Sequence, residues 1–307
     1  MWRIAGLALI NIAFIALLSV STPYFMTRGN WVVLIDNMAI EAIALSGYTL
    51  LLIGGRFDLS PDGVVAASGI AAGLLMNRGV EWYIAAPIAL FLAVAIGLIN
   101  GIVVIKARIN GLIATLTTWW IMVGLALGLT KALSPFGFPE AYQLIGQTRL
   151  LGFRIIVIYA IVTVVILSLI LHFTPLGVHI YAMGGNEEAT RMMGINTHLL
   201  GIGLYVLVGF LGGFIGLVVT SKMNAASVMA VDGMTLRIIA ASVIGGCGLS
   251  GGKGSIIGGL LGLLLMHILG NAIIQLGVSP YWQKAVLGGI LLTAALSERL
   301  KLSKRSV

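Results

Sequence analysis

Two acids lie inside a largely apolar stretch near the N-terminus, where their chemistry would be that of a proton or cation relay. Asp36 and Glu41 fall within residues 32–54. If that stretch crosses a membrane, burying such groups is costly, so they serve a function or pair with a neighbouring helix. Five residues apart, they do not share one helical face. We expect Asp36 near the outer interface and Glu41 deeper, with relay and structural pairing both open.

A second polar set lies near the end of the chain. His267, Asn271 and Gln275 are spaced four residues apart, which puts them on one stripe of a helix. No second histidine or carboxylate shares this register, so we predict no metal site. The stripe would face other protein or a wet pathway. Interhelical hydrogen bonding and pore lining are both compatible with it.

The sequence does not predict an enzyme. Histidines 172, 179, 198 and 267 lie apart, and no Gly-x-Ser-x-Gly elbow accompanies them. The glycine-rich stretch ending in Gly252 and Lys253 lacks the phosphate-binding pattern, because that pattern needs glycine where Cys247 stands. As Cys247 is the single cysteine, a disulfide framework and a thiolate metal cluster are excluded. We expect no cofactor.

The elements that must position these residues are membrane helices. The 307 residues are 59% hydrophobic and 9% charged, with a mean hydropathy of +1.09, which leaves too few polar residues to cover a soluble globule. Apolar runs long enough to cross a bilayer recur along the chain. We predict an all-α polytopic membrane protein, one domain over 1–307, with ten spans: 4–20, 32–54, 61–76, 83–105, 111–130, 154–172, 200–220, 234–248, 255–276 and 281–297.

Charge gives the orientation. An even number of spans puts both termini on one side, and the basic tail 298–307 assigns that side to the cytoplasm. In this topology Lys222 and Arg237 are outer-side charges, and Asn100 and Asn110 flank a solvated inner turn. The net charge of +8 is scattered singly, so it fits anionic lipid headgroups rather than nucleic acid.

Glycine is abundant, with 41 residues. Small residues spaced by four allow membrane helices to approach closely, and we expect this at five pairs: Gly69/Gly73, Gly97/Gly101, Gly124/Gly128, Gly212/Gly216 and Gly258/Gly262. Two glycine-rich inner loops, 53–60 and 244–254, each end one span and begin another. Their likeness suggests a parallel internal repeat, although glycine richness alone could produce it.

The longest polar stretch, 184–195, points to a soluble partner. It carries two acids and an arginine between apolar spans. Short turns would suffice for a chain that only had to cross the bilayer. We therefore expect a docking surface.

Five ordered motifs give the chain a resemblance to a known family. They are 54–60, Ile113 to Leu116, 184–189 with Gly194 and Ile195, 251–255, and Asn271 before 281–283. With these motifs the chain resembles, over nearly its whole length, the ribose-type permease subunits of bacterial ABC importers. That family includes monosaccharide and autoinducer-2 permeases.

The resemblance implies roles for particular residues. Segment 174–198 would be the coupling loop that meets a cytoplasmic ATPase, with Glu187, Glu188 and Arg191 in contact and Gly194 ending a short helix after the break at Pro175. The implied coupling residues are Gly184, Gly185, Asn186, Glu187, Glu188, Ala189, Arg191 and Gly194. The glycine-loop motifs contain Gly54, Gly55, Asp58, Leu59, Ser60, Gly251, Gly252 and Gly254.

The candidate residues of the solute pathway are Glu41, Thr115, His267, Asn271 and Gln275.

The chain also departs from the family pattern. Pro61 and Asp62 replace a usual valine-glycine, so the third span is expected to start differently. Thr117 replaces a usual glycine, and the bulky Trp119 and Trp120 follow it, which would reshape the translocation path. The solute therefore cannot be copied from one relative.

The function implied is that of an importer permease in the bacterial inner membrane. The chain would move a monosaccharide or similar small neutral solute by alternating access, driven by the ATPase below. A periplasmic binding protein and a second permease subunit, identical or related, would complete the assembly. The alternative is a proton-coupled secondary transporter in which Glu41 or Asp36 couples solute to protons.

Overall fold

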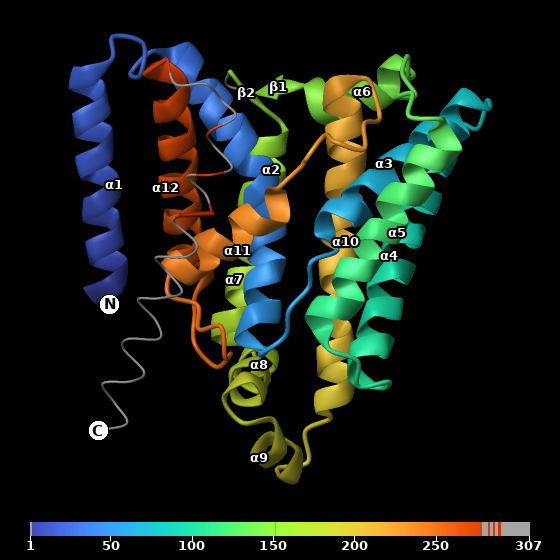
Figure 1. Cartoon of the computed structure of the whole chain (residues 1–307), viewed down its shortest axis with the longest axis vertical. Coiled ribbons are helices and arrows are strands. Elements are labelled where there is room, and N and C mark those ends of the chain that lie inside the picture. Colours follow the sequence, from blue (N-terminus) through green and yellow to red (C-terminus); the bar gives the residue numbers. More distant parts are fainter. Residues whose placement is uncertain (1, 151, 278–281, 283–284, 286–287, 290–307) are drawn as a thin grey trace.

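The computed structural model describes residues 2–150, 152–277, 282, 285 and 288–289. The described chain is a bundle of helices with one short hairpin at one end (Figure 1). The elements are α1 (Trp2–Ser21), α2 (Arg28–Ile53), α3 (Pro61–Asn77), α4 (Trp82–Ile105), α5 (Gly111–Thr130), α6 (Glu140–Gln147), β1 (Arg149–Leu150), β2 (Phe153–Arg154), α7 (Ile156–Phe173), α8 (Pro175–Gly185), α9 (Glu187–Met192), α10 (Thr197–Met223), α11 (Met234–Ile244) and α12 (Ile256–Gln275).

The prediction of an all-α polytopic membrane protein is confirmed. Seven of the described helices are long and apolar enough to cross a membrane: α1, α2, α4, α5, α7, α10 and α12. The expected spans 61–76 and 234–248 are helical but shorter, as α3 and α11. The tenth expected span, 281–297, and the tail 298–307 lie almost wholly outside the described residues.

Two helices form the centre of the bundle. Within the most apolar window of each helix, 72% of residues are buried in α2 and 67% in α10, against 17% in α1 and in α5. The largest core cluster joins α2 with α7, α8, α10, α11 and α12, and a second joins α3, α4 and α6 with the end of α10. Because α1 and α5 expose most of their apolar side chains, they suit contact with lipid or another subunit.

Glycine allows α10 to pack closely on its neighbours. A Cβ at Gly97 would lie 2.5 Å from the Tyr205 carbonyl oxygen, and one at Gly69 would lie 3.3 Å from that of Gly216. The expected close helix packing is therefore confirmed at Gly97/Gly101, Gly212/Gly216 and Gly258/Gly262, and at Gly69 of the pair Gly69/Gly73. Gly124 and Gly128 face open space in the described chain, so the prediction was wrong for that pair within this subunit.

Two helices begin inside the bundle. Pro61 at the start of α3 lies beside Gly212, near the middle of the 27-residue α10. Asp62 accepts a hydrogen bond from the Thr235 backbone N–H at 2.8 Å, so α11 begins next to the start of α3. With 11 residues, α11 rises only about 16 Å, roughly half of the hydrocarbon core. The eighth expected span is thus a half-length helix.

The ends of the bundle differ in structure. Figure 1 shows α6 and the β1–β2 hairpin at one end and α8 with α9 at the other, towards which the N-terminal end of α1 also lies. In the hairpin, Arg149 pairs with Arg154 and Leu150 with Phe153. Asp36 on α2 binds the Arg154 side chain at 3.2 Å, so Asp36 lies at the hairpin end of the bundle.

Candidate functional site

The polar stretch 184–195 forms a short helix that projects from the bundle (Figure 1). Pro175 occupies the first turn of α8, where its missing N–H costs nothing, and this separates α8 from α7. The Asn186 side chain caps α9 by accepting from the Ala189 N–H at 2.9 Å. Gly194 follows α9 with φ 83°, a conformation that suits glycine at a helix end. The expected short helix and its end are both present.

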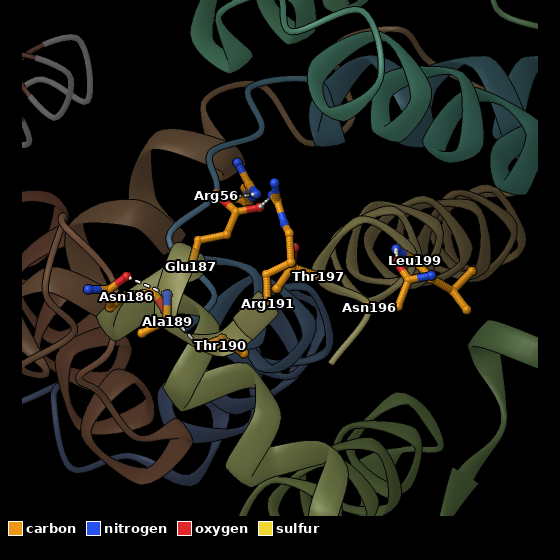
Figure 2. A network of polar contacts seen from close by, with 9 residues as sticks. All are labelled: Arg56, Asn186, Glu187, Ala189, Thr190, Arg191, Asn196, Thr197 and Leu199. Carbon is orange, nitrogen blue, oxygen red and sulfur yellow. Dashed lines mark hydrogen bonds and ion pairs between the residues drawn. The ribbon is translucent and has the colours of Figure 1, made fainter. Parts of the chain in front are cut away.

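The predicted contact residues of α9 point in different directions. Glu187 turns towards the bundle and binds Arg56 at 2.7 Å and Arg191 at 3.2 Å (Figure 2). Glu188 is exposed. Two residues that the sequence did not single out, Met192 and Met193, are 81% and 67% exposed. The outward surface of this element therefore combines Glu188 and the half-exposed Arg191 with two flexible apolar side chains, which suits an adaptable protein contact.

Three glycine pairs meet where α9 joins the bundle, and we call this the glycine junction: Gly54–Gly55, Gly184–Gly185 and Gly251–Gly252. The Gly252 N–H donates to the Ile53 carbonyl at 2.7 Å. A Cβ at Gly184 would collide with that carbonyl, and one at Gly251 would lie 2.7 Å from the Gly55 Cα. The motifs that the sequence treated as separate loops thus form one backbone contact between α2, α8 and the α11–α12 connection.

The segment after Gly55 is fixed by hydrogen bonds. The Leu59 N–H donates to Thr115 Oγ1 at 2.8 Å, and the Ser60 N–H donates to Asp58 Oδ1 at 2.7 Å. Thr115 therefore anchors this segment. Asn100 donates to Ser60 Oγ at 2.8 Å and is buried in α4, so its assignment to a solvated turn was wrong.

A charged cluster lies deeper in the bundle. Glu41 Oε1 accepts from Arg237 Nη2 at 2.6 Å and from Arg237 Nε at 2.8 Å. Glu41 Oε2 lies 3.3 Å from His267 Nε2. The cluster joins α2, α11 and α12. Of the two interpretations of Glu41, structural pairing is the one observed.

The stripe on α12 makes interhelical hydrogen bonds. Asn271 donates to Asn30 Oδ1 at 2.6 Å, and Gln275 accepts from Thr22 Oγ1 at 2.8 Å. His267 and Asn271 also line a cavity of about 380 Å³. Interhelical hydrogen bonding is therefore observed for Asn271 and Gln275, whereas His267 pairs with Glu41, and the interpretation of the stripe as a pore lining stays a prediction.

We call this space the polar cavity. It is enclosed by α2, α10, α11, α12 and the segment before α11, and its volume falls in the range of roughly 300–1,000 Å³ typical of small-molecule sites. Its polar lining residues are Asn37, Glu41, Lys222, Arg237, His267 and Asn271.

Three polar residues at or near this cavity were not recognised from the sequence. Arg237 was expected among the outer-side charges, but it lies in α11 against Glu41. Lys222, in the last turn of α10, donates to Asn37 at 3.1 Å at the rim of the cavity. Asp62 caps α11 by accepting from the Gly233 N–H at 3.0 Å and from Thr235. A charge inside an apolar run was the available signal for Arg237 and Asp62.

The fold and these two regions describe a helical membrane protein, with a short projecting helix at one end and a polar cavity among its helices. The chain belongs to the family described as branched-chain amino acid transport system / permease component, whose match covers residues 30–295. It is thus a permease component.

Its relatives agree. The chain is 35% identical to the ribose import permease protein RbsC of Escherichia coli (strain K12), over 94% of this chain and 92% of the relative. It is 33% identical to the ribose import permease protein RbsC of Bacillus subtilis (strain 168), over 94% and 90%. It is 31% identical to the L-arabinose transport system permease protein AraH of Escherichia coli (strain K12), over 100% and 94%. No solved structure matches it significantly.

Proposed function

We propose that this chain is the membrane permease of an ABC importer for a monosaccharide. The observation that carries the proposal is the pairing of a projecting docking helix with a full-length likeness to ribose and L-arabinose permeases. The chain itself performs no chemistry.

The docking helix α9 receives the motion of a separate ATPase. Its exposed residues, Glu188, Met192 and Met193, meet the ATPase, while Glu187 and Arg191 hold α9 against Arg56. Because the glycine junction leaves no side chain between α8 and α2, a displacement of α9 is passed directly to the centre of the bundle.

The assembly follows from this role. The permease lies in the bacterial inner membrane with ten spans, both termini in the cytoplasm, and halves related by a parallel repeat. A second permease copy or sister subunit, a cytoplasmic ATPase and a periplasmic solute-binding protein complete the importer. The outer end, with α6 and the β1–β2 hairpin, faces the binding protein.

Uptake in cells tests the proposal. Labelled D-ribose, L-arabinose and L-leucine are supplied to cells that express the full transporter, the transporter without this subunit, or the transporter without its ATPase. We expect pentose uptake only with all subunits. Uptake of leucine alone would overturn the sugar assignment. Pentose uptake that survives loss of the ATPase but stops when the proton gradient is removed would instead establish a proton-coupled secondary transporter.

A further inference from the structure

We infer that Asp58 is a second binding partner of Arg56, and that displacement of α9 transfers the Arg56 guanidinium from Glu187 to Asp58. The inference rests on the proposed function, since it is the ATPase that displaces α9. Arg56 and Asp58 lie in the segment between α2 and α3. They are thereby positioning residues for coupling, in addition to those of α9.

Arg56 and Asp58 carry complementary groups without partners. Arg56 Nε and Asp58 Oδ2 are both buried and make no hydrogen bond within the described chain. The first atom carries a donor and the second is an acceptor. Leaving such groups buried and unpaired is unfavourable. In the described conformation Arg56 instead binds Glu187 Oε2 through Nη2 at 2.7 Å.

The two side chains are close enough to meet. They are two residues apart in a segment that is neither helix nor strand, so their Cα atoms lie at most about 7 Å apart. Between them, the Phe57 carbonyl accepts from the Tyr205 hydroxyl at 2.7 Å, and the charges of Arg56 and Asp58 both act on that hydroxyl. A rotation of the long Arg56 side chain can therefore bring the two groups together.

Asp58 has no cation bound to it in this conformation. Its side chain is buried, and Oδ1 accepts from the Ser60 N–H at 2.7 Å. Burial raises the pKa of Asp58 to about 6, as expected of a carboxylate that hydrogen bonds compensate only in part. The Tyr48 hydroxyl, which accepts from the Asp58 N–H at 3.3 Å, is uncharged at neutral pH. An arriving guanidinium would stabilise the ionised carboxylate.

Glu187 keeps a cationic partner when Arg56 leaves. Arg191, four residues further along α9, binds Glu187 Oε1 at 3.2 Å, whereas Arg56 binds the other oxygen (Figure 2). Because Glu187 and Arg191 belong to the same short helix, they move together when α9 is displaced. The transfer therefore ends with two ion pairs, Glu187–Arg191 and Arg56–Asp58, and none of these acids is left alone.

Desolvation explains why Glu187 holds Arg56 at rest. The Arg56 and Glu187 side chains are 20% and 33% exposed, so their ion pair is partly hydrated. Moving the guanidinium to the buried Asp58 removes water from it, which is costly. This cost opposes the gain from pairing with a buried carboxylate, so loss of the Glu187 contact can decide between the two arrangements.

Asp58 connects the transfer to helices outside the glycine junction. Its carboxylate holds the Ser60 N–H at the start of α3. Asn100 on α4 donates to Ser60 Oγ at 2.8 Å, and Thr115 on α5 accepts from the Leu59 N–H at 2.8 Å. The glycine junction joins α2, α8 and the α11–α12 connection. The transfer of Arg56 would therefore pass the displacement of α9 to α3, α4 and α5.

Chemical modification of Arg56 tests the transfer. The assembled transporter, without nucleotide, is treated with phenylglyoxal, which modifies accessible arginines, and the rate at Arg56 is measured by peptide mass spectrometry. Removing a partner ordinarily exposes an arginine. In Glu187→Gln, however, the released Arg56 should turn to the buried Asp58, so that its rate falls about fivefold or more. Glu188→Gln, a change at the exposed surface of α9, should leave the rate unchanged. An unchanged or higher rate in Glu187→Gln would overturn the transfer.

A second substitution and a second state attribute the effect to Asp58. Glu187→Gln combined with Asp58→Asn should raise the Arg56 rate above that of the unsubstituted protein, because neither acid remains to hold the guanidinium. If this double variant does not assemble, the unsubstituted transporter trapped with ATP and vanadate replaces it. There the rate at Arg56 should fall while the rate at Arg191 does not. An Arg56 rate that ignores ATP, in a transporter that still imports pentose with ATP, would overturn the transfer but not the proposed function. Pentose import without ATP would overturn the proposed function.

Discussion

The glycine junction and the polar cavity connect the same parts of the molecule by opposite means. At the junction, α2, α8 and the α11–α12 connection touch through backbone, and the Gly252 N–H binds the Ile53 carbonyl at 2.7 Å. At the cavity, α2, α11 and α12 are held by charged side chains around about 380 Å³ of space. Backbone atoms in direct contact transmit a displacement from one helix to the next, whereas long side chains hold the helices further apart and leave space between them. The two regions therefore differ in packing: one is closed by backbone contact, and the other leaves an open space among charged side chains.

The largest effect is expected when one methyl group is added to the glycine junction. Gly184→Ala should bring its Cβ onto the Ile53 carbonyl and the Gly252 N–H, which are backbone atoms and cannot yield. Overpacking of this kind costs about 1–3 kcal/mol or more, and we expect pentose uptake to fall to background. Uptake and the yield of assembled transporter are the measurements.

The neighbouring glycine is the matched control for this change. Gly185 faces open space, so the Gly185→Ala variant should transport normally.

The reactivity of Cys247 measures how tightly the junction is packed, because burial raises the pKa of its thiol to about 11 and keeps it unreactive at neutral pH. Gly184→Ala should make Cys247 react with maleimide. Normal uptake in Gly184→Ala would show that the junction need not be tight.

The next largest effect is expected in the cavity. Replacing Glu41 and Arg237 together with methionine removes a pair without leaving one buried charge alone, and such replacements are often neutral for stability. We expect normal membrane levels and thermal stability but no pentose uptake. Full uptake by the double variant would mean that the charges serve folding, and the contrast between the two regions would disappear.

A smaller effect is expected where α11 begins. The Asp62 carboxylate accepts hydrogen bonds from the Gly233 N–H, the Thr235 N–H and the Thr235 hydroxyl. Asp62→Asn keeps one acceptor oxygen but removes the negative charge. Loss of such a charged hydrogen bond costs about 1–3 kcal/mol. We expect a lower melting temperature and a higher half-saturating pentose concentration, because Arg237 lies on α11 and is displaced when α11 moves.

The same helix supplies the control for Asp62. Ser68→Ala removes a buried hydroxyl that donates to Val65 within α3, and it should leave the half-saturating concentration unchanged. If Ser68→Ala and Asp62→Asn change that concentration equally, α3 as a whole and not the cap would set the position of α11.

The smallest effect concerns the ion pair that holds α9. Arg56 and Glu187 lie 2.7 Å apart with side chains 20% and 33% exposed, and exposed pairs contribute about 0–1 kcal/mol. A double-mutant cycle with Arg56→Gln and Glu187→Gln should give a coupling energy of about 1 kcal/mol in thermal unfolding. Glu188→Gln controls for loss of an acid at the exposed surface. A coupling energy of zero would make the glycine junction the sole attachment of α9.

Local patterns predicted the elements well. Apolar runs gave nine of the expected spans as helices, and Pro175 with Gly194 correctly marked the start of α8 and the end of α9. These features depend on residues close in sequence. The half-length of α11 was missed, because glycine and apolar residues continue beyond Ile244 and no charge marks its end.

The site depended on distant contacts and was only partly predicted. Glu41 and His267 were recognised as polar residues in apolar runs, but their common partner Arg237 lies 196 residues from Glu41 and was assigned to the surface. Likewise, the motifs containing Gly55, Gly184 and Gly251 were identified singly. A sequence without an alignment carries no signal that these residues meet.

The short α11 has a consequence for the biosynthesis of the chain. With 11 residues, α11 is much shorter than the roughly 20 residues that a helix needs to cross a bilayer, so it depends on the rest of the chain for its position. Its N-terminus is satisfied by Asp62, which is synthesised about 170 residues earlier, and its hydrogen bonds to Thr235 span 173 positions. The contact that places α11 therefore joins segments 173 residues apart, and it can form only after both segments have been synthesised.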